Sequence, residues 1–412
     1  MASLSRRLGD FSPRAEYDRF LTVLGAVFLG GGLGLILALV GVGFFPLPLL
    51  VWGGLGGLAT QVALPVVAWS RGQAYRPSST SQVGTVLLAV GGLSLGLAGV
   101  PGVTRAVGTV ARMGWLFLLF AGCLVLVHLL RAGGRDGMPL PTERFAPAFA
   151  QRGNRTWDEV ARWEVVAALG YVVLAAVAGL EGGWGGSTAD PVGVLVWYGW
   201  LASLAASSSL FYLPRLLGVR PDTAALVVAA RLLWHVGIVA SLLFHLRGLL
   251  ACTSVGGVLL FAALLKLFQA SGRRVLRVVG SRRVDLLPLY RQLLFLAAVF
   301  GLLASLTVPW WKGLHSGASH ILWTWMLFLF VPLLAHVFGR RGRLPTAPVV
   351  GVLSAGIVAS LLGIWPGPAA AFGVLLMSLS AFGVGAVMLF QGLGGERAVV
   401  DRIDSGTHER RS

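Results

Sequence analysis

The sequence predicts an all-α, polytopic membrane protein of about twelve transmembrane helices, arranged as three four-helix units. The mean hydropathy is +0.81. Hydrophobic residues make up 56% of the chain and charged residues only 12%, whereas soluble domains carry about 25% charged residues. Short, arginine-rich loops separate the apolar stretches, and a similar Arg/Gly turn ends the second span of at least two groups, at 213–218 and 338–343.

The apolar stretches have the length that a membrane requires. Most are near the roughly 20 residues that a helix needs to cross about 30 Å of hydrocarbon. In chain order, the expected spans are Phe20–Phe44, Phe45–Trp69, Gln82–Val100, Gly108–Leu130, Glu164–Gly183, Val192–Leu213, Thr223–Arg247, Ala251–Gln269, Leu287–Pro309, Gly313–Phe338, Val349–Ile364 and Ala369–Phe390.

Two hydrophilic loops, residues 131–163 and the basic residues 271–286, divide these spans into groups of four. The transmembrane units are therefore expected at residues 20–130, 164–270 and 287–392, between an N-terminal segment 1–19 and a tail 393–412. The leading candidates for related second spans are Val51–Trp69, Trp197–Arg215 and Ile321–Arg340.

The orientation follows from the arginines, because the chain contains only two lysines, Lys266 and Lys312. If the N-terminus is cytoplasmic, the arginine-rich segments all fall on the cytoplasmic side, as the positive-inside rule requires. We therefore expect both termini and both hydrophilic loops to be cytoplasmic, and the protein to lie in a bacterial cytoplasmic (inner) membrane.

The formal net charge of +17 is compatible with binding to nucleic acid or with binding to anionic lipid. Because the charge lies in short loops beside the membrane, we expect anionic lipid headgroups as the partner and no nucleic acid. Cys123 and Cys252 lie in or next to spans without metal-type spacing, so we expect neither a disulfide nor a zinc site.

Ionisable residues inside a membrane are costly, and they often mark functional sites. The expected spans place Glu164 and Glu181 at span ends, so the sequence predicts no deeply buried carboxylate, which argues against a proton-coupled carrier. Three basic residues, Arg231, Lys266 and Arg291, lie toward inner span ends, where long side chains extend to the interface.

Four histidines, His235, His245, His315 and His320, fall in the outer half of spans seven and ten and are the candidate cofactor-binding residues. A haem requires axial nitrogens at matched depth, which His245 with His315, or His235 with His320, would supply if these spans are neighbours. About 15 Å along one helix separates His235 from His245, so those two cannot share a metal ion. The alternative is that each histidine only makes hydrogen bonds between helices.

The turn at 213–221 and the stretch from His320 through the turn at 338–343 carry a resemblance to a known family, and the basic loop 272–283 adds weaker support. Twelve spans in three fourfold arcs are the plan of haem-copper oxidase subunit I, and the turns resemble those of NnrS-type membrane proteins, which are linked to nitric oxide metabolism. The resemblance covers about the last half of the chain. It implies the fold, a partial haem site on the outer side, and other respiratory-type membrane subunits as partners.

The chain also departs from these families. Oxidases hold a low-spin haem between spans two and ten and copper near spans six and seven. Here the expected second and sixth spans contain no histidine, and the His-Ala-His-Glu-Met type of signature of NnrS proteins is absent. The usual binuclear centre is therefore not expected, no catalytic residue is assigned, and the identity of any metal stays open.

Three functions remain open. The first is an NnrS-like membrane protein that binds haem and takes part in nitric oxide or respiratory redox metabolism. The second is a metal-free scaffold or assembly subunit of a respiratory-type complex. The third is a twelve-span transporter, against which stand the missing buried carboxylate and a longest loop that divides the spans four and eight.

Overall fold

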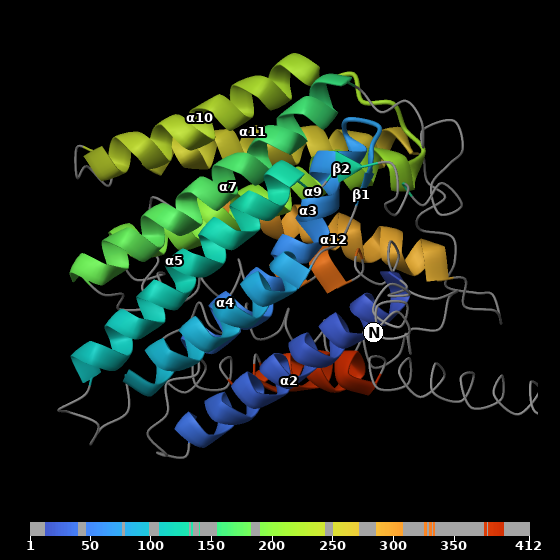
Figure 1. Ribbon diagram of the computed structural model, residues 1–412. Coiled ribbons are helices and arrows are strands. Elements are labelled where there is room, and N and C mark those ends of the chain that lie inside the picture. The colour runs from blue at the N-terminus through green and yellow to red at the C-terminus, as the bar shows by residue number, and fades with distance from the viewer. Residues whose placement is uncertain are drawn as a thin grey trace, which may run out of the picture.

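The computed structural model describes residues 13–39, 47–75, 79–98, 107–131, 133–134, 140, 155–182, 190–243, 250–271 and 286–307, and parts of 325–333 and 375–390. Apart from one pair of two-residue strands, these residues are almost entirely helical (Figure 1). Seven of the described helices are long and apolar enough to cross a membrane. The structure therefore confirms an all-α protein of the multi-pass membrane type.

The helices follow the expected spans one to nine in order. They are α2 (Pro13–Leu39), the π-helical η1 (Leu49–Gly56) with α3 (Gly57–Trp69), α4 (Ser79–Ala98), α5 (Val107–Arg131), α7 (Arg155–Gly182), the short α8 (Pro191–Gly193) with the π-helical η3 (Val194–Leu201) and α9 (Ala202–Leu217), α10 (Ala224–Leu243), α11 (Leu250–Ala270) and α12 (Leu286–Thr307). Spans ten and twelve are described only in part, and span eleven lies outside the described residues.

Two of the spans lie inside the bundle. In the most apolar window of each span, 100% of the residues of Pro191–Leu217 and 94% of those of Leu49–Trp69 are buried, against 33% to 56% in the other five spans. The two inner spans contact each other, because Trp52 stacks on Trp200 at 4.9 Å and the hydroxyl of Tyr212 donates to the carbonyl of Val62 at 2.8 Å.

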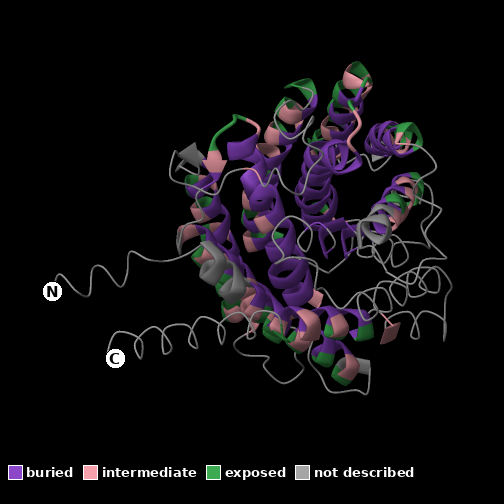
Figure 2. Ribbon diagram, turned by 90° about the vertical axis from the view of Figure 1, so that its right-hand side faces the viewer, coloured by how far each residue is buried: buried purple, intermediate pink, exposed green. Residues whose placement is uncertain are grey.

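The surrounding helices bury one face and expose an apolar one (Figure 2). Large apolar side chains on the outer faces are well exposed, for example Phe120 at 60%, Leu174 at 54% and Leu232 at 62%. Exposed apolar residues spread over several helices suit contact with lipid chains better than contact with water. The outer faces of these helices therefore suit contact with the lipid chains of a bilayer.

Pairings between helix ends show which ends share a side of the bundle. Strand β1 (Ala74–Tyr75) follows α3, and it pairs antiparallel with strand β2 (Gly133–Gly134), which follows α5. At the start of α7, Asp158 forms an ion pair with Arg215 near the end of α9. The ends of α3 and α5 therefore lie on the same side of the bundle. The start of α7 and the end of α9 also share a side, as alternate crossing of a membrane requires.

Candidate functional site

Glu164 is buried inside the helical bundle, with only 3% of its surface exposed. The expectation that this residue ends a span is wrong, because helix α7 begins at Arg155, nine residues earlier. Hydropathy placed the start of the span where the continuous apolar run begins. The polar first turns of α7, which include Asp158, extend the helix beyond that run, so Glu164 lies within it.

Arg231 on α10 neutralises this carboxylate. Its Nε donates to Oε1 of Glu164 at 2.6 Å and its Nη2 donates to Oε2 at 2.5 Å, a bidentate geometry. Only 3% of the residue is exposed, so the expectation that Arg231 extends to the inner membrane interface is also wrong. An ion pair with a buried partner replaces the solvation that the interface would have supplied.

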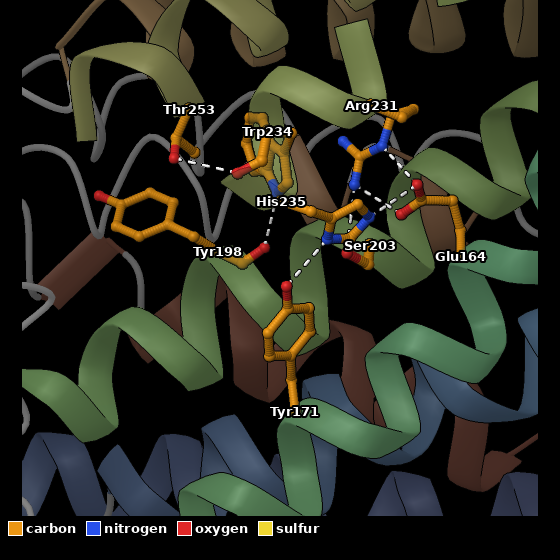
Figure 3. A network of polar contacts seen from close by, with 8 residues as sticks. All are labelled: Glu164, Tyr171, Tyr198, Ser203, Arg231, Trp234, His235 and Thr253. Atoms are coloured by element: carbon orange, nitrogen blue, oxygen red, sulfur yellow. Dashed lines mark hydrogen bonds and ion pairs between the residues drawn. The ribbon is translucent and has the colours of Figure 1, made fainter. Parts of the chain in front are cut away.

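His235 and Tyr171 extend the network by two residues (Figure 3). Nε2 of His235 lies 3.0 Å from Oε1 of Glu164, and the Tyr171 hydroxyl lies 2.9 Å from Nδ1 of the same ring. The two rings are nearly parallel, with centroids 5.7 Å apart and an interplanar angle of 15°. Tyr171, His235, Glu164 and Arg231 thus form one continuous hydrogen-bonded chain.

Helical spacing explains why these side chains meet. Glu164 and Tyr171 are seven residues apart on α7, which places them on one face two turns from each other. Arg231 and His235 are four residues apart on α10, one turn from each other. The face of α10 that points away from the bundle carries apolar residues instead, such as Val236 at 57% exposure.

The network lies beside the middle of one inner span. The Ser203 hydroxyl, near the middle of the buried span Pro191–Leu217, accepts a hydrogen bond from Nη2 of Arg231 at 3.2 Å. The guanidinium also lies 4.9 Å from the centre of the Trp234 ring. The indole N–H of Trp234 donates to the carbonyl of Tyr198 at 2.9 Å, which holds that ring against η3.

His235 is the one candidate haem ligand within the described residues. Both of its ring nitrogens are occupied by Glu164 and Tyr171, whereas an axial ligand must offer one nitrogen to the iron. In this arrangement, a haem bound by His235 would have to displace Tyr171 or Glu164 from the ring. The other three candidates lie outside the described residues, so a haem bound by them stays a prediction: His245, His315 and His320.

A second polar cluster surrounds the end of α3, and the sequence analysis did not identify it. His128 on α5 is buried, and its Nε2 lies 3.3 Å from the Tyr75 hydroxyl. Nearby, Arg215 binds both carboxylate oxygens of Asp158 at 2.8 Å and covers the Phe211 ring at 3.8 Å. Asp158 and Arg215 lie close to helix ends, so this cluster fixes the ends of helices and lies outside the middle of the bundle.

Metal chemistry finds no support in the described part of the chain, which contains no group of three or more His, Cys, Asp or Glu side chains placed to hold an ion. The Glu164 network offers one carboxylate, and Arg231 already neutralises it. No protein family model, curated protein or solved structure matches the chain. The chemistry that the network does support is the binding and transfer of protons through hydrogen bonds.

Proposed function

We propose that this chain is a twelve-span protein of the bacterial cytoplasmic membrane, built from three related four-helix units with both termini in the cytoplasm. We further propose that it serves respiratory redox or nitric oxide metabolism, as the likeness to haem-copper oxidase subunit I and NnrS-type proteins implies, without the usual binuclear centre. Anionic lipid headgroups and other respiratory-type membrane subunits are its proposed partners.

The observation that carries this proposal is the repetition of the inner span. The spans η1–α3 and η3–α9 each begin with eight π-helical residues, a rare conformation. A glycine with positive φ follows each span: Gly72 at 70°, three residues after the end of α3, and Gly218 at 65°, directly after the end of α9. After each glycine, an N–H bonds five residues back, Gln73 to Ala68 at 3.0 Å and Val219 to Pro214 at 3.1 Å.

Burial in the expected third unit supports the same arrangement. Its expected second span is Ile321–Arg340, and the described residues within it are buried to the same degree as the other two inner spans. Their exposed fractions are at most 5%: Trp325, Met326, Leu327, Leu329, Phe330, Val331 and Leu333. A third inner span, related to the first two, is the arrangement that three fourfold units require.

Close helix contacts also link the units in a ring. On α5, a Cβ at Gly122 would lie 3.0 Å from Val172 of α7, and on α12, Gly301 lies against the ring of Phe261 of α11. The first and last units meet where a Cβ at Gly25 of α2 would lie 2.5 Å from the backbone nitrogen of Leu389 (Figure 1). The described part of the last expected span thus contacts α2, which supports a closed arrangement.

Within this proposal, His245 and His315 are the haem ligands, since His235 is occupied by its neighbours. The test is a reduced-minus-oxidised absorption spectrum of the purified protein, produced with haem supplied, together with a pyridine extract that counts haem per chain. A stoichiometric Soret band that His315→Ala abolishes and His128→Ala leaves intact is the expected result. A spectrum without haem bands would contradict the redox role and leave the metal-free scaffold.

A proton-coupled carrier is the second candidate, because one specific observation favours it. The sequence argument against a carrier was the lack of a buried carboxylate, and Glu164 removes that argument. Intramembrane carboxylates paired with arginine or histidine are typical of proton relays in transporters. Proton movement into vesicles that contain the protein, driven by a substrate gradient and lost in Glu164→Gln, would favour the carrier over the redox protein.

A further inference from the structure

The hydrogen bonds of the Glu164 network define its charge. A carboxylate only accepts hydrogen bonds, so Nε2 of His235 carries a proton and donates it to Glu164. In the neutral form of the ring, Nδ1 then accepts from the hydroxyl of Tyr171. One negative carboxylate and one positive guanidinium remain, so the resting network is neutral overall.

His235 is the least buried member of this network. Its side chain is 26% exposed, whereas the side chains of Glu164 and Arg231 are only 3% and 4% exposed. An imidazole is also the side chain that changes its charge between about pH 5 and 8. We therefore place an added proton at Nδ1 of His235, the ring nitrogen that does not face the carboxylate.

Arg231 keeps one unused edge. Its Nε and Nη2 are committed to Glu164 and Ser203. Its Nη1 is buried and has no hydrogen-bond partner among the described residues. Leaving a buried charged donor without an acceptor costs roughly 1–3 kcal/mol or more. The free edge therefore favours an additional acceptor, and a negative one above all.

We propose that the network binds a proton and a small monovalent anion together. The proton forms a bond to Nδ1 of His235, and the Tyr171 hydroxyl turns from donor to acceptor. No other covalent bond changes. The added positive charge is uncompensated in a poorly solvated site, and an anion on Nη1 of Arg231 restores neutrality. Each ligand thus raises the affinity for the other.

The groups that face the network include no other negative charge that could balance the added proton. Helix α7 contributes Glu164 and Tyr171, and the inner span contributes the Ser203 hydroxyl and the carbonyl of Tyr198. Helix α11 contributes Thr253, whose hydroxyl donates to the carbonyl of Trp234 at 3.2 Å. Within the described part of the chain, no further charged side chain bonds to any member of the Glu164, Arg231 and His235 set.

Bromide binding to the full-length protein in detergent tests this proposal. Calorimetric titration with sodium bromide, in a chloride-free gluconate buffer, is compared at about pH 5.5 and about pH 8, on either side of the range in which an imidazole changes charge. Bromide is expected to bind at the lower pH, with an affinity that falls by up to about tenfold per pH unit as the proton is lost.

Two variants separate the proton from the anion. In Glu164→Gln, the neutral amide leaves Arg231 uncompensated, so bromide is expected to bind at the higher pH as well. In His235→Gln, the ring that takes the proton is gone, so the pH dependence is expected to disappear. Asp222→Asn is the matched control, because it makes the same carboxylate-to-amide change in the exposed ion pair with Lys266.

Three results would overturn the proposal. The first is wild-type protein that binds no bromide at the lower pH. The second is a His235→Gln variant that keeps the full pH dependence. The third is an Asp222→Asn variant that behaves like Glu164→Gln, which would place the effect at the surface. Should Glu164→Gln fail to fold, the histidine variant still decides, and none of these results depends on haem.

Discussion

Arg231 binds both carboxylate oxygens of Glu164, at 2.6 and 2.5 Å, although the two residues lie 67 positions apart in the sequence. The pair joins α7 to α10, and the bond from Arg231 to Ser203 ties it to the buried span Pro191–Leu217. Burying two charges is costly, and their attraction offsets the cost only with good geometry and further hydrogen bonds. The network supplies both, through the bidentate contact and through His235.

Replacing Tyr171 with Phe removes the hydroxyl that is hydrogen-bonded to Nδ1 of His235 and leaves the ring stack in place. We expect a loss of about 0.5–1.5 kcal/mol in the free energy of unfolding, the contribution of an ordinary hydrogen bond. Thermal or denaturant unfolding in detergent measures it. The ¹⁵N resonance of Nδ1 in His235 should shift in the same variant. A variant with unchanged stability and an unshifted resonance would show that the contact does not form.

Two glycines on α2 provide a matched pair for the contact between the first and last units. A Cβ at Gly25 would lie 2.5 Å from the backbone of Leu389, whereas a Cβ at Gly30 meets nothing within 4 Å. Gly25→Ala is expected to destabilise the protein by about 1–3 kcal/mol through overpacking. Gly30→Ala is expected to be neutral or to stabilise the helix by up to about 1 kcal/mol. Equal melting temperatures for the two variants would argue against the closed ring.

Cysteine labelling tests the proposed orientation. Glu181 lies exposed at the end of α7, and Asp222 lies exposed in the loop before α10. In a chain without Cys123 and Cys252, Glu181→Cys is expected to react with a membrane-impermeant maleimide on intact spheroplasts. Asp222→Cys is expected to react only after the membrane is opened. The reverse pattern would invert the topology.

The spans could be predicted from the sequence because each is a continuous apolar run between arginine-rich loops. Helices α2 to α12 therefore fall close to the expected positions. The start of α7 could not be predicted in this way, because its first turns are polar and helical propensity extends beyond the apolar run. Because the apolar run begins at Glu164, the sequence places this residue at a span end and does not identify the candidate site.

The sequence contains a weak indication of the residues that bond to Glu164, namely their spacing along two helices. The seven-residue spacing from Glu164 to Tyr171 and the four-residue spacing from Arg231 to His235 both place polar residues on one helix face. Nothing in one sequence shows that those two faces meet, because the pairing depends on how α7 and α10 pack around the inner span. The sequence therefore predicts Arg231 at the membrane interface, which is where an arginine without a partner is expected.

A double-mutant cycle on Glu164 and Arg231 tests the central claim most directly, namely that these two charges lie together inside the membrane bundle. Unfolding in detergent is measured for Glu164→Leu, Arg231→Leu and the double variant. Each single variant leaves a buried charge without its partner and should lose about 3–5 kcal/mol, whereas the double variant should lose less than either. Losses that simply add in the double variant would show that the two residues do not interact.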